Sequence, residues 1–266
     1  MATTRKSDLG NLLLAGSRER FNAAVRKPRE QYWKNCVREV HEEGEIGNYD
    51  TVGNLGPATV HNEESTIVYD KIEYNNRTSI TNIVYEKGVK ATLEAQRFDR
   101  YKFVVKQFGE PLVQKLNFKK ERIVADAYNH AFTDTGADGV AIISDTHPLK
   151  NNATLYNDNL IVGELGVDTL KAGKMRFNHI YDQAGEFYGS RPTHLLIHPD
   201  KAFLAYELLN SALMAYSMNQ TKNVLQDISP LKIIENPYLD YNVTTNVSPW
   251  FMLDKNIDEA GCVMQI

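Results

Sequence analysis

The sequence has 266 residues, of which 42% are hydrophobic and 24% are charged, and its formal net charge is −4. These values are ordinary for a globular protein with a sizeable core, and the negative charge argues against a surface coated everywhere by nucleic acid. No apolar run approaches the ~20 residues of a membrane span, and the residues near Met1 do not resemble a signal peptide. We therefore expect no membrane contact and an intracellular, reducing compartment. Cys36 and Cys262 lie far apart in the sequence, which implies neither a disulfide framework nor a metal site.

Charge is unevenly distributed at the start of the chain. Residues 1–38 carry nine Lys or Arg against three Asp or Glu, whereas residues 39–50 hold five acidic residues and no Lys or Arg. Such a segment is either a solvated tail or an arm that docks on an acidic neighbour. Helices are expected at 18–27 and again around 32–40, the second with an apolar face that combines Tyr32 or Trp33, Cys36, Val37 and Val40. This part has few residues to fill a core, so it predicts an arm.

Residues 66–87 have the composition of a β-hairpin. Two segments rich in Ile, Val, Tyr and Thr, 66–74 and 79–87, flank a turn predicted at Asn75, Asn76 and Arg77. Apolar and charged residues are mixed on both faces, which is typical of a ribbon that projects and touches other chains; a twisted sheet with an imperfect pattern is the alternative. Residues 89–96 then alternate cleanly and predict a half-buried strand, which leads into a short helix at 98–108.

A long helix is predicted for residues 111–132. Pro111 suits the first helical position, and an apolar stripe recurs at steps of four or seven residues through Leu112, Leu116, Ile123, Ala127 and Ala131. Basic residues fill most of the other face: Lys115, Lys119, Lys120 and Arg122. This cluster is either the solvated face of a helix or a weak, sequence-independent contact to phosphates. We interpret the helix as a spine with separate structures at either end.

Beyond the spine, strands and helices alternate. Strands are expected at 139–144, 193–198, 231–235, 242–245, 250–254 and 261–266. Helices are expected at 167–186, capped by Asp168, and from Pro199 through Leu209. The alternation predicts a compact mixed α/β unit over about 145–255.

The sequence carries no catalytic signature. Gly173-Lys174 lacks the remainder of a phosphate-binding loop, and His194 and His198 would stand roughly 13 Å apart on a strand, too far to share a metal ion. The residues Asp134, Asp138 and Asp145 faintly resemble a calcium loop but supply too few oxygen ligands. Ser144, Asp145 and His147 are too close in sequence to form a typical catalytic triad. We therefore expect no catalytic, cofactor-binding or metal-binding residues.

Three segments resemble a known family. Residues 125–149, ADAYNHAFTDTGADGVAIISDTHPL, are similar to the end of the spine helix in Mu-like head subunits of tailed bacteriophages. Residues 192–211, PTHLLIHPDKAFLAYELLNS, and 236–255, NPYLDYNVTTNVSPWFMLDK, resemble the later strand–helix unit and last strands of that family. The order of arm, projecting hairpin, spine and α/β unit also resembles this family of major capsid proteins, which has the Hong Kong 97-type fold.

The resemblance implies an α+β capsid fold with an N-terminal arm at 1–45, an extended β-hairpin loop at 46–85 and a peripheral domain at 86–144 that contains the spine. An axial domain would follow at 145–255, and residues 256–266 would begin the return to the peripheral domain. The implied function is non-enzymatic: self-assembly into hexamers and pentamers of an icosahedral shell around double-stranded DNA. Many modest contacts repeated by symmetry stabilise such a shell. Implied partners are neighbouring capsomers, packaged DNA, and separate scaffolding and portal proteins, with assembly in the host cytoplasm.

Two departures from that pattern accompany the resemblance. Members of the family usually continue for several tens of residues past the position of Ile266, so we expect either that this sequence is incomplete or that the peripheral domain is closed differently here. Second, no scaffolding segment precedes the arm, so any scaffold is expected to be a separate protein. Some members also cross-link a loop lysine to a neighbouring subunit, but neither Lys71 nor Lys87 is aligned with that role. Two alternatives remain: an encapsulin-like shell for a protein cargo, and a small metal-assisted hydrolase using Asp134, Asp138, Asp145 and His147.

Overall fold

The structure is a computed structural model that describes residues 19, 21–25, 31–41, 44–52, 58, 60, 66–67, 69, 74–88, 101–149, 152–213, 222–228, 230–255 and 263–265. The chain divides into two compact units. Residues 1–33 and 83–123 form the first unit, and residues 34–82 and 124–266 form the second. Among the described helices, none has both the length and the apolar character that crossing a membrane requires.

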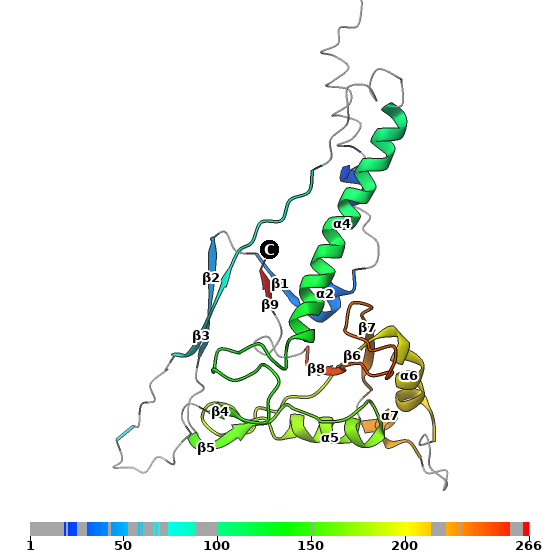
Figure 1. Cartoon of the computed structure of the whole chain (residues 1–266). Coiled ribbons are helices and arrows are strands. Elements are labelled where there is room, and N and C mark those ends of the chain that lie inside the picture. The colour runs from blue at the N-terminus through cyan, green and yellow to red at the C-terminus, as the bar shows by residue number, and fades with distance from the viewer. Residues whose placement is uncertain are drawn as a thin grey trace, which may run out of the picture. The chain divides into compact units, whose positions relative to one another are not determined.

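The long helix is α4, Tyr101–Asn129 (Figure 1). The predicted start at Pro111 is wrong, because Pro111 lies inside the helix and the separate short helix expected at 98–108 is continuous with it from Tyr101. A proline inside a helix removes one backbone hydrogen bond, and this long helix retains its helical conformation across that position. After Asn129 the chain turns, with the amide of Asp134 donating to His130 O, so the predicted end at 132 is three residues too late.

In the first unit, residues 31–33 lie along α4. Trp33 is only 1% exposed, and its backbone N–H donates to Glu121 Oε2 at 3.0 Å. Gln31 Nε2 donates to Asn117 Oδ1 at 3.4 Å. Burial raises the pKa of the Glu121 carboxyl, although the backbone N–H groups of Trp33 and Tyr32 oppose that shift. Residues 21–25 are helical, which confirms part of the helix predicted at 18–27.

The second predicted helix is mostly wrong. Only α2, Trp33–Cys36, is helical, and β1, Arg38–Val40, is a strand. β1 pairs in parallel with β9, Val263–Gln265, so a strand predicted at the end of the sequence is confirmed. The parallel partner explains why Val40 is extended rather than helical, since residues far away in sequence satisfy its backbone. Tyr128 of α4 fixes the end of α2 by donating its hydroxyl to Cys36 O at 2.6 Å.

An antiparallel ribbon is formed by β2, Ile46–Val52, and β3, Tyr74–Thr81 (Figure 1). The predicted turn at Asn75, Asn76 and Arg77 is wrong, because these residues lie inside β3. Arg77 fits a strand because β2 supplies its partner: both oxygens of Asp50 accept from the Arg77 guanidinium at 2.6 and 2.8 Å. The hydrogen bond from Arg77 holds the pKa of Asp50 below its usual range. The strand predicted at 89–96 lies outside the described residues.

A three-stranded sheet with the order β7-β6-β8 supports the rest of the second unit. β6, His194–Ile197, pairs in parallel with β7, Lys232–Glu235, and antiparallel with β8, Phe251–Leu253. The helices of this region are α5, Val167–Asn178, the 3-10 turn η1, Pro199–Lys201, α6, Ala202–Asn210, and α7, Val224–Ile228. We call the sheet and these helices the lobe. They confirm the predicted mixed α/β unit.

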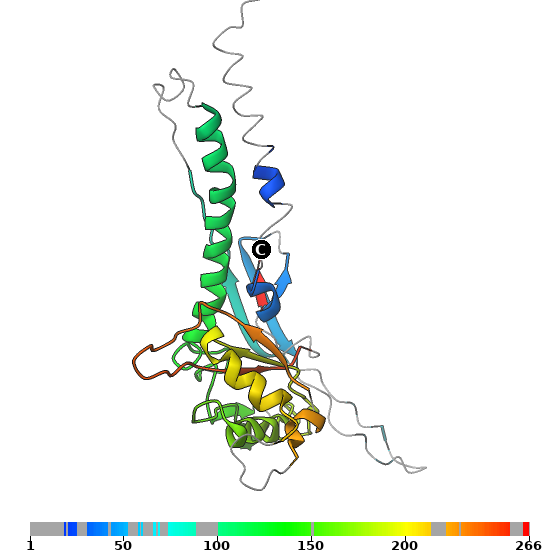
Figure 2. The same cartoon turned by 90° about the vertical axis from the view of Figure 1, so that its right-hand side faces the viewer.

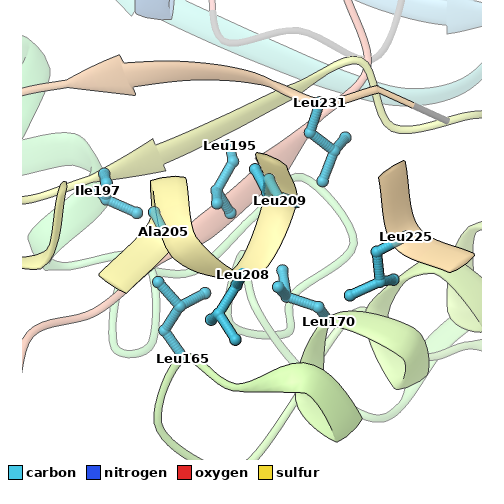
Figure 3. Packing of buried hydrophobic residues seen from close by; sticks show 9 residues of the cluster. All are labelled: Leu165, Leu170, Leu195, Ile197, Ala205, Leu208, Leu209, Leu225 and Leu231. Carbon is cyan, nitrogen blue, oxygen red and sulfur yellow. The ribbon is translucent and has the colours of Figure 1, made fainter. Parts of the chain in front are cut away.

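The core of the lobe lies where α5, α6 and α7 meet the sheet (Figure 3). Leu170 from α5 and Leu195 from β6 are both 0% exposed, and Leu208 from α6 is 2% exposed. Their neighbours in the same cluster are Leu165, Ile197, Ala205, Leu209, Leu225 and Leu231. Gly173 of α5 permits close packing, because a Cβ there would lie 2.9 Å from Met252 Sδ of β8.

Several predicted elements around the lobe are wrong. Residues 139–144 form turns rather than a buried strand, since Gly139 has a φ of +84° and Ile142 is 40% exposed. Residues 242–245 lie in a turn closed by a bridge between Asn242 and Val247. The helix predicted to Glu186 ends at Asn178, and its N-cap is Gly166, whose N–H donates to Thr169 Oγ1, rather than Asp168. A short antiparallel pair, β4, His147–Leu149, and β5, Asn152–Asn157, lies in a part of the chain where no strand was predicted.

Candidate functional site

The side chains considered for a hydrolase are only partly brought together. His147 Nδ1 lies 2.6 Å from Asp138 Oδ2, and His147 Nε2 lies 3.2 Å from Asn159 Oδ1. Asn159 is oriented by its own bonds, because Oδ1 also accepts from Ser144 N and Nδ2 donates to Ile142 O. The second ring nitrogen of His147 therefore faces a fixed amide rather than a nucleophile. This His–Asp pair ties two loops to the start of β4.

The remaining candidates of that set stand apart from the pair. Among the described residues, Ser144 Oγ bonds with Thr146 rather than with His147, and Asp134 and Asp145 are exposed. Within the described part of the chain, no group of three or more His, Cys, Asp or Glu could hold a metal ion. An arrangement that pairs a nucleophile with a base, or three ligands with an ion, is thus not formed by these described residues.

His194 and His198 have separate structural partners. His194 lies on β6, where Thr193 Oγ1 is 2.8 Å from its Nδ1. Burial lowers the pKa of His194, and the positive charges of Lys255 and Lys232 lower it further. His198 follows the strand, accepts a hydrogen bond from Asp200 N at 3.2 Å, and stacks on Tyr241 with ring centroids 4.7 Å apart. The predicted strand placement is confirmed for His194, and His198 caps the turn that opens α6.

A cavity of about 630 Å³ lies in the second unit beside the end of α4 and β8. Aromatic rings form part of its wall, and the ring of Phe251 packs against those of Tyr128 and Phe132 at centroid distances of 5.2 and 5.9 Å. The acidic residues on its wall are already engaged: Asp158 pairs with Arg176, and Asp254 Oδ2 accepts from Ser190 Oγ and Arg191 N. The cavity is therefore suited to bury apolar groups rather than to perform acid–base chemistry.

Exposed apolar residues are the more prominent feature of the surface. Directly after β3, Ile83 is 66% and Val84 is 88% exposed. On α6, Phe203 is 89% exposed and Tyr206 is 48% exposed, while Leu208 and Leu209 on the opposite side of the helix are buried. Large apolar side chains left in water at several places are typical of a protein that associates with other molecules.

A family model described as phage capsid protein matches residues 77–266. The chain belongs to the phage capsid protein family. The match covers α4, the lobe and β9, so the resemblance drawn from the three sequence segments is confirmed. No curated protein sequence matches the chain.

Solved capsid structures share the fold of this capsid protein. A chain of the procapsid of bacteriophage JBD30 matches with a TM-score of 0.62 at 11% identity, covering 89% of this chain and 100% of that chain. A chain of the bacteriophage JBD30 capsid matches with a TM-score of 0.59 at 10% identity, covering 82% of this chain and 93% of that chain. A chain of the JBD30 capsid decorated with minor capsid protein trimers matches with a TM-score of 0.57 at 10% identity, covering 80% of this chain and 92% of that chain.

Sequence reasoning missed two structural anchors of the capsid protein. Asn223 is 2% exposed and joins the end of α6 to α7: Nδ2 donates to Leu208 O and Ser211 O, and Oδ1 accepts from Leu225 N. Glu121 lies between Lys120 and Arg122 in the sequence, yet it is 3% exposed. Its spacing of eight residues from Val113, which is also buried, is the signal that could have placed it on the inner side of the helix.

Proposed function

We propose that this capsid protein is the major head subunit of a tailed bacteriophage. In this proposal, copies of the chain self-assemble into hexamers and pentamers of an icosahedral shell that encloses packaged double-stranded DNA. The shell has no enzymatic role, and the subunit resides in the virion capsid after assembly in the host cytoplasm. The observation that carries the proposal is the family match over residues 77–266, which extends through α4 and the lobe.

The fold likeness supports the same role. The procapsid chain of bacteriophage JBD30 is covered along 100% of its length despite only 11% identity, so the two chains share an architecture rather than a set of conserved side chains. A structural subunit needs that architecture more than it needs particular reactive groups.

The distribution of apolar surface also supports self-association. Val84 after β3 and Phe203 on α6 are each nearly nine-tenths exposed although they belong to different parts of the chain. A subunit of a closed shell contacts several neighbours and needs several such surfaces. A small enzyme would be expected to gather its exposed apolar residues around one cleft.

The regions of the Hong Kong 97-type fold are assigned on this basis. Residues 1–45 would be the N-terminal arm and 46–85 the extended loop, an assignment supported by the antiparallel pairing of β2 with β3. Residues 86–144 would form the peripheral domain with the spine helix α4, and 145–255 the axial domain, supported by the core of the lobe. Residues 256–266 would begin the return to the peripheral domain. Scaffolding and portal proteins would be separate chains.

Sedimentation with negative-stain imaging tests the proposal. The purified full-length chain should form hexamers or megadalton particles, and removal of residues 62–85 should abolish the particles while near-UV circular dichroism of the lobe persists. A monomer or small oligomer under all conditions would overturn the assignment. Particles that form in an expression host but contain protein instead of DNA would indicate a compartment shell.

A further inference from the structure

One surface of α4 carries four cations that the fold does not use for ion pairing. Lys115, Lys119 and Arg122 are exposed and Lys120 is partly exposed; we call these four residues the basic face. Lys115, Lys119 and Arg122 are spaced by four and three residues, so they share one side of the helix and extend about 10 Å along its axis. The opposite side of the same segment includes the buried Val113.

The basic face is not neutralised within the described part of the chain. The ion pairs there join Lys34 with Glu39, Arg77 with Asp50, Arg176 with Asp158, Lys201 with Glu164, and two histidines with aspartates. None of them includes a residue of the basic face. The nearest acidic residue in sequence, Glu121, is buried and accepts a hydrogen bond from Trp33 N. Because no described acidic residue pairs with them, these four cations give this part of the helix a local positive potential, although the formal charge of the chain is −4.

Aromatic rings hold the lysines of the basic face in position. Lys119 Nζ lies 5.0 Å from the ring centroid of Tyr85, and Lys120 Nζ lies 5.1 Å from that of Trp33. Lys115 Nζ lies 5.6 Å from the ring of Phe118. A ring attracts an ammonium group without consuming its three hydrogen-bond donors, so these donors remain available to oxygen atoms. The lysines are therefore ordered and still able to bind an anion.

Charge complementarity identifies the anion as a polyphosphate chain rather than an acidic protein segment. The acidic stretch 39–50 is the obvious protein partner, but Glu39 is paired with Lys34 at 3.8 Å and Asp50 with Arg77 at 2.6 Å. Duplex DNA instead presents about one phosphate per 1.7 Å of its axis, so several phosphates fall within the length of the basic face whatever the register. Contacts of this kind position the polymer and read no sequence.

We propose that the basic face, Lys115, Lys119, Lys120 and Arg122, is a sequence-independent contact surface for double-stranded DNA. The inference rests on the proposed role as a shell around packaged DNA and names the part of the subunit that touches the polymer. Each exposed cation that reaches a phosphate releases condensed counterions, so the affinity depends on salt concentration.

The test compares two triple variants of the full-length chain. For each variant, the unassembled protein is separated by sedimentation and used for the binding measurement. The first variant is Lys115→Gln, Lys119→Gln, Arg122→Gln; Lys120 is retained because it covers the buried Trp33. The matched control is Lys171→Gln, Arg191→Gln, Lys232→Gln, which removes the same charge from the second unit. Binding to a 30-base-pair duplex of random sequence is measured across a range of salt concentrations. Each phosphate contact contributes about 0.9 to the magnitude of the slope of log K against log salt concentration. This magnitude should therefore fall by about 2 to 3 for the first variant and stay unchanged for the control.

Equal slopes for the two triple variants would overturn the inference. It would also be overturned if the first variant lost self-association at unchanged DNA affinity, since the basic face would then contact protein. These failures remain distinct from failure of the proposed function, because particle formation by the unsubstituted chain is scored separately by imaging.

Discussion

The lobe and the β2–β3 ribbon, both within the second unit, are built in opposite ways. In the lobe, Leu195 and Leu196 of β6 are 0% exposed, and helices cover the sheet. The ribbon has two strands, and just after β3 the N–H of Asn82 donates to Glu45 O. The next two residues, Ile83 and Val84, are exposed. A two-stranded ribbon has too little buried surface to be stable alone. The comparison indicates that the lobe has a hydrophobic core of its own, whereas the ribbon consists of two paired strands followed by exposed apolar residues.

The largest effect is expected in the lobe core. Leu195→Ala should lower the free energy of unfolding by about 2–5 kcal/mol, because it opens a cavity at a fully buried position between the sheet and the helices. Urea unfolding followed by circular dichroism measures the change. Val84→Ala is the control, and its effect should be small because Val84 is 88% exposed. A loss below 1 kcal/mol for Leu195→Ala would contradict the view of the lobe as a self-sufficient core.

A smaller loss is expected where a buried amide joins elements of the lobe. Asn223→Ala removes the partner of Leu208 O, Ser211 O and Leu225 N, and should cost about 1–3 kcal/mol of unfolding free energy. Asn210→Ala, on the exposed end of α6, should stay within about 0.5 kcal/mol in the same urea experiment. If both variants behaved alike, the hydrogen bonds of Asn223 would not contribute to the cohesion of the lobe.

Glu121 offers a test of a buried charge outside the lobe. Burial raises the pKa of Glu121 in the folded state above its pKa in the unfolded chain. The protonated carboxyl therefore favours the folded state at low pH, and this contribution to the free energy of unfolding is lost as the pH rises through the pKa of the folded state. The wild-type chain should therefore lose stability relative to Glu121→Gln between about pH 4 and pH 7. Unfolding of both proteins by urea across this range gives the difference. A flat difference, or one that grows in favour of the wild type, would show that the hydrogen bonds from Tyr32 and Trp33 outweigh burial.

Substitution of Val84 should have the smallest effect on the free energy of unfolding and a large effect on particle formation. Val84→Asp should change the unfolding free energy by no more than about 0.5 kcal/mol, since the side chain is 88% exposed. Burying an unpaired carboxylate between subunits is costly, so we expect the variant to form no particles. Sedimentation provides the measurement, and Val84→Ile, which keeps the apolar character, should assemble. Normal assembly of the aspartate variant would exclude this segment from any subunit contact.

The sequence was most informative where a local pattern and the tertiary environment agree. The strand at 193–198 and the helix opened by Pro199 were predicted because a Leu-Leu-Ile run and a helix-initiating proline act locally. The predicted turn at Asn75, Asn76 and Arg77 failed because a local pattern cannot show the strand that pairs with it: Asp50, the partner of Arg77, lies 27 residues away in the sequence. The predicted strand at 139–144 failed because Gly136 and Gly139 permit a turn that an apolar run alone does not reveal.

The candidate surfaces show the same limit. The lysine cluster of α4 was visible in the sequence, but its rings were not, since Trp33 and Tyr85 come from distant segments. The spacing of Glu121 from Val113 indicates its side of the helix, but the hydrogen bond that it accepts from Trp33 N is visible only in the structure. Composition predicts that a helix face is basic, and only the structure separates cations that are paired from those that are not.

The parallel pairing of β1 with β9 has a consequence for the order of events during synthesis. Arg38 is among the first residues to leave the ribosome, yet its partner Val263 is made about 220 residues later. Every strand and helix of the lobe lies between these two positions, so the lobe can mature while β1 still waits for its partner. The pairing of β1 with β9 is therefore a late event, because β1 has no β9 strand to pair with until the chain has been translated through Gln265.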